Sequence, residues 1–283
     1  MSAEFWVIIT AILAAVTCGW IGSFLVLRQN SMLGDAISHA VLPGLVVGFL
    51  LTSSRAVIPM VIGAAAMGLL TAYLTEVLKR SGRVYGDAAL TVTFTLLFAI
   101  GVILVSAYTG QIDLDQECVL YGEIAYVPWD RLIMGTADLG PRPVWILSSA
   151  LVLNVLFVLL FYKQLKITSF DPQMAQAVGI SPRRWHYLLM AMVSLTVVAA
   201  FELVGAILVV AMLIIPGAVA TLLTHRLPLV LALTVVVGAI SAVGGYYAAS
   251  VFDASIAGFM AVVGGIVFIL AAFGSRMLAR LQT

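Results

Sequence analysis

Long apolar stretches constrain this chain more than any other feature of its sequence. Nine of them follow one another between residues 5 and 275, and a helix needs about 20 apolar residues to cross the hydrocarbon core of a bilayer. They are 5–27, 36–54, 56–78, 88–108, 144–162, 186–201, 203–223, 228–251 and 255–275. Only 10% of the residues are charged, against roughly 25% in soluble domains. The sequence therefore predicts a protein that crosses a membrane many times.

These stretches predict helices rather than the strands of a barrel. Lipid offers no partner for backbone N–H and C=O groups, so a spanning segment must satisfy them internally. The stretches are also longer than the alternating segments of about 10 residues that build membrane barrels. We expect an all-α membrane protein, a single domain over 1–283, with eight or nine transmembrane helices, because 186–223 can form two short helices or one bent helix. Gly44 and Gly48 are spaced for close helix packing.

The basic residues fall mainly on one side of the predicted membrane. With nine spans, eleven basic residues face one side and three the other, and the positive-inside rule places the richer side in the cytoplasm. The eleven are Arg28, Lys79, Arg80, Arg83, Lys163, Lys166, Arg183, Arg184, Arg226, Arg276 and Arg280, and the three are Arg55, Arg131 and Arg142. We expect a cytoplasmic C-terminus and an external N-terminus. No basic residue precedes the first span, so we expect it to stay in the mature protein rather than be removed as a signal.

A carboxylate and an imidazole lie close together near the start of the second apolar stretch. In "NSMLGDAISHAVLPG" (30–44), Asp35 and His39 are four residues apart. Such a step turns a helix by about 400° and rises about 6 Å, so both side chains point the same way. Carboxylate oxygen and imidazole nitrogen together suit Mn, Fe or Zn. Two ligands are too few for selective binding, whereas a symmetric dimer would bring two Asp35 and two His39 side chains together.

A structural role for this pair is the alternative. The helix dipole favours an acid such as Asp35 in the first turn, and His39 can hydrogen-bond to a neighbouring helix. Ionisable groups inside membrane spans are costly, so function is the default hypothesis. We expect Asp35 and His39 to bind a divalent cation in transit, and we expect no permanently bound cofactor.

A short helix with clear start and stop signals is predicted on the basic side, within 163–184. Asp171 can cap it, Pro172 suits its first position, and Gly179 suits the stop after it. The whole segment is Asp171, Pro172, Gln173, Met174, Ala175, Gln176, Ala177, Val178 and Gly179, with the helix over 172–178. Two interpretations stay open, because the helix can lie on the lipid surface or fit a groove in another protein.

Several activities lack their motifs in this sequence. It contains no G-x-x-x-x-G-K-[ST], no H-E-x-x-H, no G-x-S-x-G and no cysteine cluster. We therefore expect no enzymatic activity, and a pump of this kind would take its energy from another subunit or from an ion gradient. The net charge of +1 gives no argument for a nucleic-acid partner.

Further acidic residues are candidates for a gate or an entry path. Four lie in the connection 109–142, which we expect to face outward: Asp113, Asp115, Glu117 and Glu123. They can guide a cation or contact a delivery protein, or simply be solvated as in many loops. Glu202 separates two apolar runs and belongs either to the outer surface or to a buried pathway. A short sixth span favours the surface.

Four segments resemble the permease subunits of ABC importers for manganese, zinc and iron. They are "SMLGDAISHAVLPG" (31–44), "DAALTVTFTLLFAIGVIL" (87–104), "SFDPQMAQAVGI" (169–180) and "LVGAILVVAMLIIPGAVA" (203–220). The resemblance implies a bacterial plasma-membrane permease that works with a second permease copy or paralogue. It also implies cytoplasmic ATP-binding subunits and an extracytoplasmic metal-binding protein that delivers the cargo.

The same resemblance implies roles for particular residues. It implies that 172–178 is the coupling helix that engages the ATPase. It also implies that Asp35 and His39 are the pair that binds the metal within the membrane. The segment "DLDQECVLYGEIAYVP" (113–128) is more similar to the manganese and iron branch than to zinc permeases. We expect Mn²⁺ as the transported ion, with Zn²⁺ or Fe²⁺ as the alternatives. The rival interpretations are an ion-coupled secondary transporter, with Asp35 and Glu202 relaying protons, and a permease for chelated iron.

Overall fold

The apolar stretches form the helices of this fold. The computed structural model describes residues 3–52, 57–80, 82, 85–108, 124–134 and 137–281. The long helices are α1 (Ala3–Leu27), α2 (Met32–Thr52), α3 (Val57–Arg80), α4 (Gly86–Tyr108), α6 (Arg142–Leu160), α9 (Pro182–Val204), α10 (Ala206–Leu223), α11 (Leu227–Phe252) and α12 (Ile256–Leu281). Within the described ranges, eight helices are long and apolar enough to cross a membrane, while α2 contributes a shorter apolar stretch, Met32–Gly48. The predicted all-α membrane fold is confirmed.

A glycine divides the segment that the sequence left ambiguous. Gly205 has φ +78° and ψ 163° and stands between α9 and α10. A side chain is strained at such a positive φ, whereas glycine adopts it freely. The stretch 186–223 is therefore two helices, and α9 extends at both ends beyond the predicted 186–201.

The connections hold smaller elements. A 3₁₀ helix, η1 (Ile124–Trp129), precedes the antiparallel hairpin of β1 (Arg131–Met134) and β2 (Ala137–Pro141). The hairpin, which the sequence did not predict, touches the first span, because Gly140 of β2 lies against the ring of Trp6. On the other side, α7 (Tyr162–Phe170) and α8 (Pro172–Ala177) join α6 to α9.

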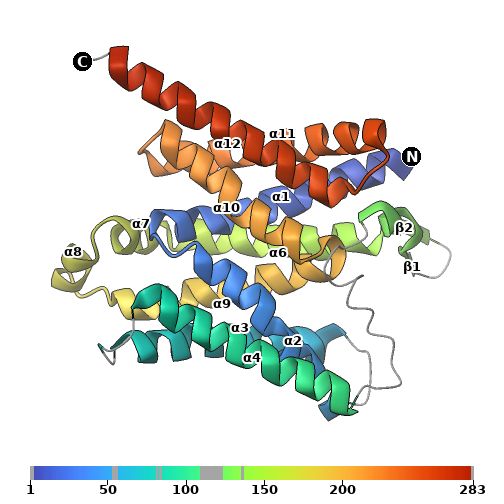
Figure 1. The fold of residues 1–283 in the computed structure, drawn as a ribbon, viewed down its shortest axis with the longest axis horizontal. Helices are drawn as coiled ribbons and strands as arrows, with labels where there is room; N and C mark the ends of the chain where they lie inside the picture. Colours follow the sequence, from blue (N-terminus) through green and yellow to red (C-terminus); the bar gives the residue numbers. More distant parts are fainter. Residues whose placement is uncertain are drawn as a thin grey trace.

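The helices pack around α1, the most buried of the spans. Helices α10 and α11 lie against α1, and α12 covers both. On the other side of the bundle α2 packs against α3 and α4, and α9 connects this group to the rest (Figure 1). The two chain ends lie at opposite ends of the bundle, with α7 and α8 at the end of the C-terminus and the β hairpin at the end of the N-terminus.

Small residues allow α2 and α3 to approach closely. An ideal Cβ placed on Gly44 would lie 2.7 Å from the carbonyl carbon of Gly63 and 2.8 Å from the Cα of Ala64. A Cβ on Gly63 would in turn lie 3.5 Å from the backbone nitrogen of Gly48. The predicted use of Gly44 and Gly48 in close helix packing is confirmed.

Candidate metal-binding site

The start of α2 places Asp35 and His39 on one face of the helix. Asp35 lies in the first turn, which begins at Met32, and His39 lies one turn later. His39 Nε2 is 3.5 Å from Asp35 Oδ1, which is long for a hydrogen bond between these groups. The two side chains are thus close enough to share a ligand, and they do not form a short bond that a cation would have to break.

This face of α2 points away from the packed interior. The side chains of His39 and Asp35 are 36% and 38% exposed, while Ile37 and Ala40 on the same helix are fully buried. A polar pair in a membrane span is expensive unless it meets protein, water or an ion. The bundle therefore presents both ligands at its surface, where a second chain or a pathway can reach them.

Two aromatic rings of α4 surround the imidazole. Phe94 stacks on His39 with ring centroids 5.9 Å apart and planes 27° apart, and Phe98 meets it edge-on at the same distance. These contacts restrict the orientation of the His39 ring. Sequence reasoning missed both phenylalanines, although their i, i+4 spacing in 87–104 marks one face of a helix.

Pro43 interrupts the helix one turn beyond His39. Proline has no N–H, so Pro43 cannot donate the usual bond to the carbonyl oxygen of His39. Helix α4 approaches at this point, because a Cβ on Gly101 would lie 2.8 Å from Pro43 Cδ. Pro43 thus leaves the carbonyl oxygen of His39 without its usual helical donor, and α4 packs tightly against the interruption.

The pair of Asp35 and His39 would by itself make only part of a metal site. Among the residues that the structure describes, His, Cys, Asp and Glu side chains nowhere gather in a group of three or more that could hold a metal ion. Mn²⁺ favours about six ligands and Zn²⁺ about four. The Asp35 and His39 pair therefore needs ligands from water or from another chain.

The predicted short helix is present as α8. Asp171 caps it, because its Oδ1 accepts a 2.8 Å hydrogen bond from the backbone N–H of Met174. The helix ends at Ala177, one residue earlier than predicted, since Val178 forms the C-cap. Gly179 then turns the chain with φ +82°. Met174 and Val178 expose more than half of their surface, which gives α8 an apolar surface free of the bundle.

A partly buried arginine ties the region before α8 to the turn before α2. Arg28, which follows α1, donates 2.9 Å hydrogen bonds from Nε to Ser169 Oγ and from Nη2 to Thr168 Oγ1. Burial of the guanidinium lowers the pKa of Arg28 to about 10. The turn after Arg28 leads to α2, and Asp171 caps α8 just after Ser169.

The remaining predicted site residues are only partly located. Glu202 lies in the last turn of α9, which continues to Val204. The argument from a short sixth span is therefore wrong, since α9 has 23 residues. The side chain of Glu202 is outside the described part of the structure, and so are the four acids of the connection that we expect to face outward: Asp113, Asp115, Glu117 and Glu123.

Comparison with known proteins adds independent information. The model of the ABC 3 transport family matches residues 2–275. The manganese transport system membrane protein MntD of Bacillus subtilis is 53% identical over 268 residues, which cover 95% of this chain and 90% of MntD. The zinc transport system membrane protein TroD of Treponema pallidum is 41% identical, over 93% of this chain and 72% of TroD.

A solved structure has the same fold. It is described as PsaBC from Streptococcus pneumoniae in complex with Fab, and it matches with a TM-score of 0.82 and 31% sequence identity. The match covers 100% of this chain and 96% of the PsaBC chain.

Proposed function

This chain belongs to the ABC 3 transport family, and we propose that it is the permease subunit of an ATP-driven importer of divalent transition-metal ions, with Mn²⁺ as its cargo. The whole chain acts as one membrane domain. The observation that carries the proposal is the outward-facing pair of Asp35 and His39 on a helix of a membrane bundle. The 53% identity to a manganese transport protein supports manganese over zinc and iron.

A second permease, either another copy or a paralogue, completes the pathway. When α2 of each chain faces the shared axis, two carboxylates and two imidazoles meet at one point. Four ligands with mixed oxygen and nitrogen donors bind a divalent cation, and water can fill further positions of Mn²⁺. Binding must stay weak enough for release, so an incomplete protein cage suits transport.

ATP-binding subunits supply the energy at the end of the bundle that carries α8. The exposed Met174 and Val178 offer an apolar contact for a groove in such a subunit. Arg28 connects the residues just before α8 to the turn that leads into α2. Movement of α8 can therefore reach the helix that carries Asp35 and His39 through directly bonded elements.

The orientation follows from the distribution of charge. The described cations Arg28, Lys79, Lys166 and Arg183 adjoin helix ends on the side of α8, and the positive-inside rule makes this side cytoplasmic. The C-terminus then lies in the cytoplasm of a bacterial cell, and the N-terminus and the β hairpin face an extracytoplasmic metal-binding protein.

Uptake in vesicles tests the proposal. The chain is reconstituted with its ATP-binding subunits, and entry of radiolabelled Mn²⁺ is measured with and without ATP and with competing Zn²⁺. Wild type should show ATP-dependent entry, and Asp35→Asn with His39→Gln should reduce it at least about tenfold.

The control for this experiment is Asp87→Asn, which removes an exposed acid from the first turn of α4. It should leave uptake unchanged. Normal uptake by the correctly assembled Asp35 and His39 variant would reject the site. Uptake that follows a proton gradient without ATP would indicate a secondary transporter, and uptake of chelated iron alone would indicate a different cargo.

A further inference from the structure

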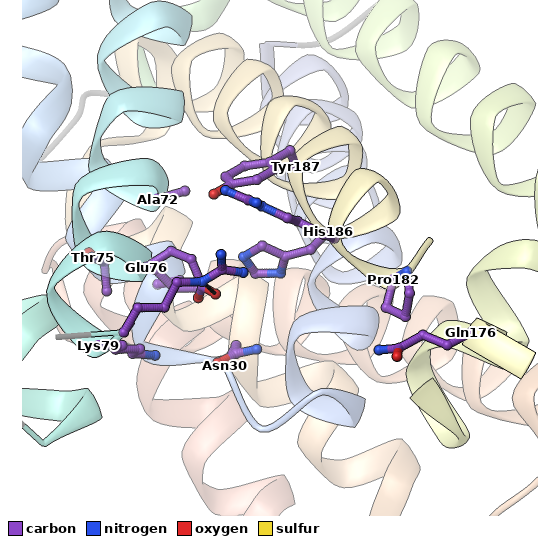
Figure 2. Close-up of a pocket in the computed structure, with 12 residues that line it drawn as sticks. Asn30, Ala72, Thr75, Glu76, Lys79, Gln176, Pro182, His186 and Tyr187 are labelled. Atoms are coloured by element: carbon purple, nitrogen blue, oxygen red, sulfur yellow. Dashed lines mark hydrogen bonds and ion pairs between the residues drawn. The ribbon is translucent and has the colours of Figure 1, made fainter. Parts of the chain in front are cut away.

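A polar cavity opens at the end of the bundle that carries α8. Its volume is about 310 Å³, the lower end of the range for small-molecule sites, roughly 300–1,000 Å³. Four elements contribute to its wall: the start of α2, the end of α3, helix α8 and the start of α9. Figure 2 shows Glu76 and Lys79 of α3 opposite His186 and Tyr187 of α9. The pair of Asp35 and His39 does not line this cavity.

The cavity carries an excess of positive charge. Three cations line it, Lys79, Arg80 and Arg183, against one carboxylate, Glu76. Arg80 Nε lies 3.0 Å from Glu76 Oε1, so these two charges compensate each other. Within the described residues, neither Lys79 nor Arg183 has a carboxylate within ion-pair distance. No carboxylate therefore neutralises these two positive charges, and the guanidinium of Arg183 lies over the ring of Tyr187, 5.9 Å from its centroid.

Two buried hydroxyl groups in the wall also lack partners. Thr75 is 2% exposed, and its Oγ1 has no hydrogen-bond partner in the described part of the chain. The hydroxyl oxygen of Tyr187 is also inaccessible to solvent and also has no hydrogen-bond partner in that part of the chain. Buried polar groups are normally hydrogen-bonded. Both hydroxyls are closed to solvent in this arrangement, so a ligand with acceptor oxygens would reach them only if neighbouring side chains move.

The beginning of α9 adds to the positive potential. The wall contains Pro182 and Arg183, which open this helix of 23 residues. Its N-cap, Ser181, makes no side-chain capping bond. The first backbone N–H groups and the positive end of the helix dipole favour an anion at such a position.

We propose that this cavity binds a phosphate group, carried either by an anionic phospholipid of the adjoining leaflet or by a soluble phosphate compound. Phosphate supplies several acceptor oxygens and negative charge, which match Lys79, Arg183 and the beginning of α9. Basic pockets between membrane helices are a known way of binding lipid headgroups. A divalent cation fits poorly here, since Glu76 is already paired with Arg80 and two free cations repel it.

The site also touches α8, because Gln176 lines it. A bound phosphate would therefore join α3 and α9 of the bundle to α8. It would hold these elements in one arrangement.

Binding to the full-length chain tests the proposal. The chain is purified in detergent with the subunits that accompany it, stripped of lipid, and titrated with phosphatidylglycerol, phosphatidylcholine or inorganic pyrophosphate. Bound lipid is counted by native mass spectrometry, and thermal unfolding is followed for each ligand. Phosphatidylglycerol should bind and raise the unfolding temperature, and the variant Lys79→Gln with Arg183→Gln should bind it at least about fivefold more weakly.

The matched control is Lys163→Gln with Arg184→Gln. It removes the same two charges from exposed positions outside the cavity, and it should bind like wild type. A response to pyrophosphate alone, lost in the cavity variant, would assign the site to a soluble phosphate compound. Equal binding of phosphatidylcholine, equal loss in both variants, or no binding of any ligand would overturn the proposal. No metal or ATP is present, so these outcomes leave the import proposal untouched.

Discussion

The guanidinium Nε of Arg28 donates a 2.9 Å hydrogen bond to the hydroxyl oxygen of Ser169, which lies 141 residues later in the chain. A second bond from the same guanidinium reaches Thr168 Oγ1. Arg28 is thus held by the end of α7, and it fixes the point where α1 passes into the turn before α2. This single side chain joins the two regions that the proposed mechanism must couple.

Replacing Arg28 should weaken the fold. Arg28→Ala removes both bonds, and hydrogen bonds to charged groups contribute about 1.5–3 kcal/mol each. We expect a clearly lower unfolding temperature in detergent, measured by differential scanning fluorimetry, and a smaller loss for Arg28→Lys, which cannot reach both hydroxyls in a planar fork. Unchanged unfolding of Arg28→Ala would show that the contact does not hold these elements together.

The effect of Arg28→Ala should not depend on pH near neutrality. The pKa of Arg28 is lowered by burial to about 10, so the folded chain loses this proton only as pH rises through that value. Below it, folded and unfolded chains both carry the charge, and the proton count does not change on unfolding. The difference in unfolding temperature between wild type and variant should be the same at about pH 6 and about pH 8. A marked change in this difference between the two pH values would contradict a pKa of about 10 for Arg28.

Removing the cap of α8 should weaken contact with the ATP-binding subunit. Asp171→Ala leaves the backbone N–H of Met174 without its acceptor, and loss of such a cap costs about 0.5–2 kcal/mol. Copurification of the ATP-binding subunit should fall, while Asp171→Asn, which keeps an acceptor oxygen, should retain most of it. Asp87→Ala, which removes an exposed acid from the first turn of α4, is the control. Full copurification with Asp171→Ala would show that α8 needs no preformed shape.

Adding a methyl group between α2 and α3 should destabilise the bundle. In Gly44→Ala the new Cβ would meet the backbone of Gly63 and Ala64, and overpacking costs about 1–3 kcal/mol. The control is Gly265→Ala in α12, because a Cβ there meets nothing within 4 Å. We expect a lower unfolding temperature for Gly44→Ala alone. Equal behaviour of the two variants would mean that α2 and α3 are less closely packed than described.

Acid should slow metal uptake through His39. A protonated imidazole has no lone pair for a metal, so metal binding and protonation compete. Initial Mn²⁺ uptake in vesicles should fall as the pH is lowered from about 7.5 to about 5.5. The uptake that remains in His39→Gln should fall less over the same interval. A rate that is constant over the interval would argue against His39 as a ligand.

Local signals in the sequence predicted much of this architecture. The spans are long apolar runs, and α8 has its own start and stop residues in Asp171, Pro172 and Gly179. The shared face of Asp35 and His39 follows from helix geometry alone. The limits of α9 were less accurate, because its first turn carries Arg183 and Arg184, which an apolar pattern leaves out.

Features that depend on tertiary packing could not be predicted in this way. Phe94 and Phe98 reach His39 only because α4 packs against α2. The cavity beside α8 draws its wall from four elements that are distant in sequence. The bonds of Arg28 to Ser169 and Thr168 span about half of the chain. Each of these features depends on how the helices are placed relative to one another, and a local sequence pattern carries no information about that placement.

The outward-facing pair of Asp35 and His39 has a genetic consequence. Each chain holds half of the ligands in the assembly we propose. A chain that lacks a ligand would therefore inactivate every dimer that contains it. In a cell that makes wild-type and Asp35→Asn chains in equal amounts, random pairing into homodimers would leave only about one assembly in four with a full set of ligands. Such an allele would be dominant, whereas one that prevents folding would be recessive.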